Sequence, residues 1–133
     1  MSETHDMTGR TVLVTGANTG IGLAVAKGLA AKGATLILHG RDRAKLDRAV
    51  EAVAAVARVP MSRVVADFAD LAAVARLARE IEAKAPALDV LVNNAGVIRD
   101  RMELTRDGYE STFQVNHLAP FLLTNLLLDA LRA

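Results

Sequence analysis

The stretch that decides the fold is residues 15–22, which read TGANTGIG. It follows a short apolar run at residues 11–14 (TVLV) and leads into a helical pattern that starts near Ile21. A strand, a glycine-rich turn and a helix N-terminus in this order form an anion-binding site, because free backbone N–H groups and the positive end of the helix dipole face the ligand. The order predicts a dinucleotide-binding turn, and the alternative is an ordinary structural turn.

The glycines of this turn have different tasks. Gly16 allows a tight turn off the strand, because it has no Cβ. Gly20 and Gly22 allow a ligand to approach the backbone and the helix to pack close to the strand. We therefore expect this turn to bind the cofactor through Gly16, Asn18, Thr19, Gly20, Ile21 and Gly22.

Composition narrows the class of protein. The chain of 133 residues is long enough for one domain, 1–133, with a hydrophobic core, and its 52% hydrophobic and 23% charged residues are typical of a globular protein. The formal net charge is +1 and no basic stripe stands out, which argues against nucleic acid as a partner. The chain has no cysteine, so disulfides and cysteine metal sites are excluded, and we predict no metal site.

The sequence gives no sign of export or membrane insertion. Residues 1–6 are polar and lack the apolar centre of a signal peptide. The longest apolar stretch, 118–128, is too short to span a bilayer. We therefore expect a cytoplasmic protein without a membrane partner.

Apolar periodicity predicts strands that alternate with helices. The strands are expected at 11–16, 35–38, 63–66 and 88–92, and the helices at 20–32, 42–57, 70–85 and from about 108 to the end of the chain. Such alternation predicts an α/β fold, a parallel sheet with helices on both faces. Right-handed crossovers give the strand order 3-2-1-4 and place the ligand crevice between the first and fourth strands, at their C-terminal ends.

Charged side chains follow the second strand at this end of the sheet. Arg41 suits the 2′-phosphate of NADP, and its alternative interpretation is a solvated loop charge. Asp42 is interpreted as a helix N-cap rather than a ribose ligand, although it keeps NAD open as the cofactor. His39 is interpreted as a strand-end side chain rather than a catalytic base.

Two further polar groups follow the third and fourth strands. Asp67 ends the third strand, where a carboxylate can accept a hydrogen bond from the adenine amino group or simply form a turn. Residues 93–96 (NNAG) follow the fourth strand. A side-chain amide beside a glycine can join loops and let the backbone approach a ribose, although such a run alone is usually a turn.

These motifs together resemble the short-chain dehydrogenase/reductase family. The resemblance rests on the TGxxxGxG pattern of 15–22, on Asp67, on the NNAG run and on Asn116 in the last predicted helix. Residues 115–124 (VNHLAPFLLT) are similar to the branch that includes retinol dehydrogenase-like, NADP-linked enzymes. The resemblance implies a Rossmann fold and hydride transfer between a nicotinamide and an alcohol or carbonyl.

The resemblance also implies roles for single residues. Asp67 and Phe68 would contact the adenine, and Asn93 would stabilise the sheet. Ala95 and Gly96 would lie along the ribose. Asn116 would be one of four catalytic residues, with an ordered water of a proton relay at its carbonyl.

The spacing of Asn116 and Pro120 has a consequence of its own. Pro120 has no N–H and cannot bond the carbonyl four residues earlier, which belongs to Asn116. In a continuous helix this carbonyl is left free, and we expect the helix to bend there. The alternative is a plain proline kink without further use.

The chain departs from the family in its catalytic residues. The family's serine and its Tyr-x-x-x-Lys pair are expected on the next strand and the helix after it, which these 133 residues do not include. The only tyrosine, Tyr109, cannot stand in, because Phe113 follows it at the fourth position. General acid–base catalysis therefore lacks its central groups. We interpret the chain as the N-terminal, cofactor-binding part of an oxidoreductase, with the C-terminal strands missing and the substrate site absent unless it is completed. The alternative is a non-catalytic nucleotide-binding module, or a fragment that needs another chain.

The last predicted helix is apolar on nearly every face. One stripe packs on the sheet, and a helix that is hydrophobic all round must bury the rest as well. The resemblance implies that this helix forms much of the subunit interface. With the bare edge of the fourth strand beside it, we expect a homo-oligomer or aggregation.

Overall fold

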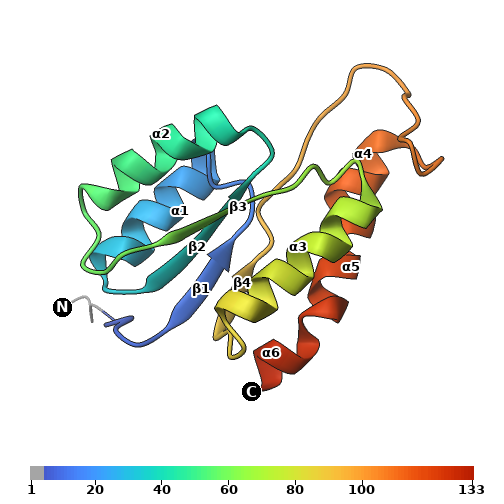
Figure 1. Ribbon diagram of the computed structural model, residues 1–133. Helices are drawn as coiled ribbons and strands as arrows, with labels where there is room; N and C mark the ends of the chain where they lie inside the picture. The colour runs from blue at the N-terminus through green and yellow to red at the C-terminus, as the bar shows by residue number, and fades with distance from the viewer. Residues whose placement is uncertain (1–4) are drawn as a thin grey trace.

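The computed structural model describes residues 5–133, so the first four residues of the polar N-terminal segment lie outside it. Four parallel strands form one sheet, with helices packed against it (Figure 1). The strands are β1 (Thr11–Val14), β2 (Thr35–Gly40), β3 (Ser62–Val65) and β4 (Val90–Val92). Their order, β3-β2-β1-β4, confirms the predicted 3-2-1-4 topology, with its reversal between β1 and β4.

The three crossover helices lie close to their predicted ranges, although the second ends at residue 54 rather than near residue 57. They are α1 (Gly20–Ala31), α2 (Arg43–Ala54) and α3 (Leu71–Lys84). Asp42 caps α2 by accepting the Lys45 N–H, and Asp70 caps α3 by accepting from Ala72 and Ala73. Gly33, at φ +91°, ends α1 in the left-handed conformation, with its N–H on the carbonyl of Ala30.

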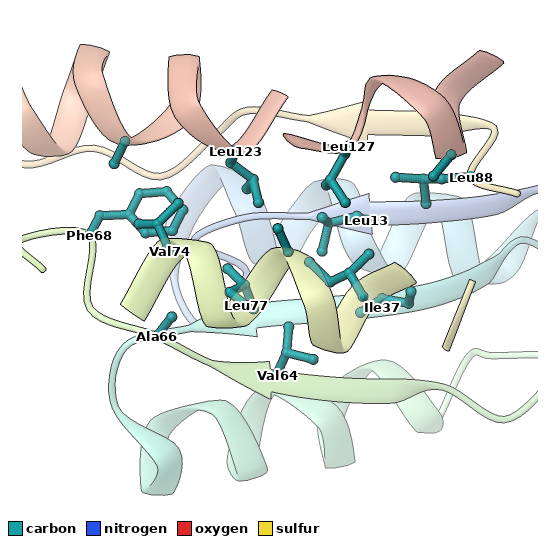
Figure 2. Packing of buried hydrophobic residues seen from close by; sticks show 14 of the residues in the cluster. Leu13, Ile37, Val64, Ala66, Phe68, Val74, Leu77, Leu88, Leu123 and Leu127 are labelled. Carbon is teal, nitrogen blue, oxygen red and sulfur yellow. The ribbon is translucent and has the colours of Figure 1, made fainter. Parts of the chain in front are cut away.

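Alternating side chains of the strands divide the core into two layers. Val12, Val14, Leu36 and Leu38 pack with α1 and α2 on one face of the sheet. Leu13, Ile37 and Val64 face the other way, toward α3 and the last helices, where Figure 2 shows them against Leu77, Leu123 and Leu127. Burying each such side chain contributes about 1.5–3 kcal/mol. The two layers hold the strand ends, and with them the loops, in place.

The segment after β4 differs from the single helix predicted from about residue 108. It consists of α4 (Ser111–Phe113), a π-helical turn η1 (Gln114–Leu118), α5 (Ala119–Leu126) and α6 (Leu128–Arg132). The helical part begins later because Gly108, at φ +85°, still belongs to a turn, and Glu110 caps α4 by accepting the Phe113 N–H at 2.7 Å. Leu127, at φ −94° and ψ 5°, separates α5 from α6.

The sequence predicted a bend before Pro120, and the structure has a widened helical turn at that place. The backbone widens just before Pro120: the Ala119 N–H bonds the carbonyl of Gln114, five residues earlier. A π-turn of this kind accommodates the proline, which cannot continue the normal ladder. The widened turn contains Asn116.

The fourth strand is shorter than predicted and lies at the sheet edge. Leu88 precedes β4, is buried, and donates its N–H to the carbonyl of Ala130 in α6. β4 pairs with β1, and among residues 5–133 no strand pairs with its other side. Within the same residues, no helix is both long and apolar enough to cross a membrane.

Candidate dinucleotide-binding site

A cavity of about 400 Å³ lies where the loops after the parallel strands meet. This is the switch point of the sheet, where ligands bind in open α/β folds. Of the residues predicted to bind the cofactor, the cavity is lined by Gly16, Asn18, Thr19, Gly20, Ile21, Arg41, Asp67, Phe68, Ala95 and Gly96. Gly22, Asn93 and Asn116 are not among its lining residues. The remaining lining residues are His39, Lys45, Ala66, Asn94, Val97 and Val115.

The glycine turn has the geometry that its sequence predicts. Gly16 and Gly20 have φ angles of +61° and +56°, where side chains are strained. A Cβ on Gly20 would meet open space, so its backbone faces the cavity without obstruction. A Cβ on Gly22 would lie 2.1 Å from the Gly16 carbonyl oxygen. Gly22 therefore permits helix α1 to start directly against the turn.

Thr15 and Asn94 fix the turn to the end of β4. The Thr15 hydroxyl accepts the backbone N–H groups of Asn94 and Ala95, each at 3.0 Å. The Asn94 side-chain amide donates to the carbonyls of Thr15 at 3.1 Å and Gly16 at 3.0 Å. These contacts hold the glycine turn and the NNAG run at a fixed separation across the switch point.

Two cations border the cavity at the end of β2. Arg41 and Lys45 are exposed and line the cavity. Neither side chain forms an ion pair in the part of the chain that the structure describes. Asp42, between them, is committed to the cap of α2, and its hydrogen bonds with the first turn hold the pKa of this carboxyl below its usual range. Two free cations beside the glycine turn create a positive edge suited to a phosphate.

The end of β3 supplies an aromatic wall. The Phe68 ring is buried and stacks on the His39 ring, with centroids 4.6 Å apart. Gln114 donates to the Phe68 carbonyl at 3.1 Å, which ties this wall to the π-turn. Asp67 accepts the Ala69 N–H at 2.9 Å through one oxygen, while its exposed side chain lines the cavity. The turn interpretation of Asp67 is therefore realised, and it leaves room for a ligand contact.

Comparison with known proteins identifies this arrangement. A family model described as short chain dehydrogenase matches residues 10–133. The chain belongs to the short-chain dehydrogenase family. Human retinol dehydrogenase 13 is 44% identical over 126 residues, which are 94% of this chain and 38% of that protein.

Solved structures of the family share the fold. Pseudomonas aeruginosa RhlG in complex with NADP is 30% identical, with a TM-score of 0.82 over 99% of this chain and 52% of that chain. A metagenomic short-chain oxidoreductase in complex with NADP is 32% identical, with a TM-score of 0.81 over 93% of this chain and 56% of that one. The chain thus spans about two fifths of retinol dehydrogenase 13 and about half of these solved chains.

The asparagines Asn93, Asn94 and Asn116 contact different parts of the structure. Asn93, expected to stabilise the sheet, donates to the Thr124 hydroxyl on α5 at 3.1 Å. The contacts that join the strand ends belong instead to Asn94. Asn116 forms a pair of 2.8 Å hydrogen bonds with the backbone N–H and carbonyl of Val97. In this short-chain dehydrogenase chain, Asn116 therefore fixes the loop after the NNAG run from outside the cavity.

Sequence reasoning missed several residues that shape the site. Lys45 had a signal, because it lies four residues after Arg41 and in the first turn of α2. Asn94 was visible as the second amide of the NNAG run. Thr15 was quoted only as the start of the glycine motif, although it is buried and donates toward the Val92 carbonyl. No local pattern indicated that Val97, in the loop after the NNAG run, and Val115, in the π-turn, would both line the cavity. In the described residues, no group of three potential metal ligands occurs.

Proposed function

We propose that this chain binds NADP(H) as the cofactor-binding part of a short-chain dehydrogenase-type oxidoreductase, which transfers hydride between NADP(H) and an alcohol or carbonyl. The observation that carries the proposal is the single cavity in which the glycine turn, the Arg41–Lys45 edge, the Asp67–Phe68 wall and the Ala95–Gly96 backbone meet. The NADP complexes of RhlG and of the metagenomic oxidoreductase support the choice of ligand.

Each part of a dinucleotide finds a chemically suited partner. The N-terminus of α1 suits the pyrophosphate, since its N–H groups and dipole favour an anion. Arg41 and Lys45 suit the 2′-phosphate. Phe68 and Asp67 form the adenine side, and the backbone at Gly96, where a Cβ would meet only the Asn116 amide at 3.3 Å, suits a ribose. Ile21 is 76% exposed at the mouth of the cavity, an apolar surface that a bound cofactor would cover.

The chemistry divides between cofactor and protein. The nicotinamide supplies or accepts the hydride when the cofactor is bound. The chain's own residues bind and orient it: Thr15 and Asn94 fix the glycine turn, and Asn116 fixes the loop at Val97. The proton donor of the family, a tyrosine followed by a lysine, is not present in these 133 residues. The 133-residue chain is thus equipped for binding rather than for turnover.

The binding test compares NADP with NAD by calorimetry on the purified chain. Arg41→Ala should weaken NADP binding by about 1–3 kcal/mol, because it removes a charge-assisted contact with a phosphate, and should leave NAD binding unchanged. Arg58→Ala is the matched control, since Arg58 is an exposed arginine that is not among the cavity residues. Equal affinity for both cofactors, unaffected by Arg41→Ala, would show that the cofactor preference is wrong.

The second candidate is a nucleotide-binding module without catalysis of its own, and the missing tyrosine and lysine favour it for the isolated chain. A panel of alcohols and carbonyls with NADP or NADPH should show no change in nicotinamide absorbance above buffer. Gly22→Ala, which obstructs the turn, is the control for contaminating activity. Reproducible turnover that this substitution abolishes would contradict the module and favour a complete catalytic site.

A further inference from the structure

His39 occupies a buried position between the two walls of the cavity. It is 2% exposed and lies near the end of β2. Its Nδ1 lies 3.2 Å from the backbone nitrogen of Gly16 in the glycine turn. Its Nε2 lies 2.9 Å from the carbonyl oxygen of Ala66 at the end of β3, and its ring stacks on Phe68. One side chain therefore contacts the phosphate side and the adenine side of the site.

The two partners determine the protonation of the ring. A backbone N–H can only donate, so Nδ1 must be the acceptor from Gly16. A carbonyl can only accept, so Nε2 must carry the proton that bonds Ala66. Only the neutral Nε2–H tautomer satisfies both contacts. An imidazolium would place an N–H on Nδ1 directly against the Gly16 N–H and break the link to the turn.

Three charged side chains from different elements line the cavity together with this ring. They are Asp67 after β3, Arg41 after β2 and Lys45 in α2. Burial lowers the pKa of His39, and the bond to Ala66 and the carboxylate of Asp67 partly oppose this shift. The neutral form demanded by the geometry is thus also the form that burial favours.

We propose that neutral His39 is a positioning residue of the dinucleotide site, which sets the separation of the glycine turn from the Asp67–Phe68 wall through its bonds to Gly16 and Ala66. This inference rests on the proposed function for its ligand. The ring then does more than pack in the core. Protonation of the ring releases the Gly16 N–H, so the glycine turn is no longer held in position against the Asp67–Phe68 wall. Dinucleotide affinity falls as a result.

Three substitutions separate positioning from packing. His39→Phe keeps the ring and its stacking but removes both hydrogen bonds. His39→Asn offers an oxygen near the position of Nδ1 and restores the acceptor for Gly16, without a group that titrates. Ile37→Val changes a residue two positions before His39, on the same face of β2, and should lower stability; Ile37 does not line the cavity.

The first readout is the dissociation constant of NADP at neutral pH, measured beside the melting temperature. His39→Phe should bind about tenfold more weakly, the effect of one or two lost hydrogen bonds. His39→Asn should recover part of this loss, and Ile37→Val should change stability alone. A folded His39→Phe variant with unchanged affinity would overturn the proposal, as would a loss that follows stability equally in all three variants.

The second readout is the pH profile of NAD binding, chosen because NAD lacks the 2′-phosphate that itself titrates near neutrality. Affinity of the unaltered chain should fall on acidification, and affinity of His39→Asn should not follow it. If NAD affinity depends on pH in the same way in the unaltered chain and in His39→Asn, the proposal is overturned.

The third readout needs no ligand and remains informative if a variant fails to fold. Nitrogen-15 NMR of the unaltered chain should show the Nε2–H tautomer of His39, and the Gly16 amide signal should move as the ring titrates. If the chain binds neither cofactor, the proposed function fails, and this measurement alone then decides whether His39 is coupled to Gly16. A Gly16 amide that is insensitive to His39 would overturn it.

Discussion

The part of the chain before β4 and the part from β4 onward, here called the first and the second region, differ in how much of their apolar surface is buried. Of the large hydrophobic side chains that remain exposed, the earlier part contributes Ile21 and Val56. The later part contributes the others, which are Val90, Ile98, Met102, Leu104, Tyr109, Phe113, Phe121 and Leu126. Strands β1 and β2 are almost fully buried, whereas β4 at the sheet edge is not.

The difference follows the path of the chain. The β1–α1–β2–α2–β3–α3 part provides all the buried residues of one core layer, shares the second layer with the last helices, and supplies most of the cavity loops. The part from β4 onward supplies one wall of the cavity and one buried stripe, and leaves a strand edge and an apolar helix face exposed. The first region thus supplies most of the cavity lining, while the second leaves apolar surface exposed, for which we predict a further partner.

The largest expected effect is on the glycine turn in the first region. Gly22→Ala places a Cβ 2.1 Å from the Gly16 carbonyl oxygen and 2.4 Å from the Asn94 amide. Backbone must move, so we expect a loss of about 3 kcal/mol in unfolding free energy and loss of cofactor binding. Gly28→Ala is the matched control in the same helix, because its Cβ meets nothing within 4 Å. That control should gain about 1 kcal/mol in urea unfolding.

Both substitutions test whether the turn is packed as tightly as its contacts indicate. If Gly22→Ala and Gly28→Ala have the same effect on unfolding, helix α1 does not begin against the turn, and the first region is looser than described.

A smaller effect is expected on association through the second region. Phe113 and Phe121 are 51% and 62% exposed, and the ring of His117 stacks between them along the helix. The unaltered chain should associate or aggregate at low micromolar concentration, and the Phe113→Glu/Phe121→Glu double variant should do so about tenfold less. Because both side chains point outward, unfolding free energy should change by less than about 1 kcal/mol. Light scattering that shows a stable monomer in both proteins would mean that this face needs no partner.

The smallest effect is on the pH dependence of stability, and it arises in the first region. Burial lowers the pKa of His39 from its ordinary value of 6.5. Below that pH the unfolded chain binds a proton that the folded chain does not, so stability falls as pH drops through 6.5 toward the folded pKa. His39→Asn should lose this part of the decline, whereas the carboxylates titrate alike in both proteins. If the urea midpoints of the unaltered chain and of His39→Asn change in parallel across that pH interval, the decline does not come from His39.

The sequence predicted the first region well because its signals are local. Glycine spacing, the caps at Asp42 and Asp70, and Gly33 at a helix end each depend on a few neighbouring residues. The strand order followed from the alternation of elements, and the structure confirms it.

The sequence predicted the second region less well because its apolar pattern does not determine where the helix starts or how the helix accommodates Pro120. Gly108 joins a turn closed by Thr105, so the helix starts later than its apolar pattern indicates. Pro120 produces a wide π-turn, an outcome that a local rule cannot distinguish from a kink. The roles of His39 and Asn94 were hidden for a different reason, because their partners lie 23 or more residues away along the chain.

The most direct test of the account is hydrogen–deuterium exchange on the 133-residue chain with and without saturating NADPH. If the first region holds the dinucleotide, protection should increase at residues 16–22, at the start of α2 and at 66–68, and also at 94–97, where the second region supplies its wall. Exchange in α6, which does not line the cavity, should stay unchanged. Protection that is absent from the glycine turn, or that is confined to the segment after residue 110, would contradict the assignment of the cavity as the cofactor site.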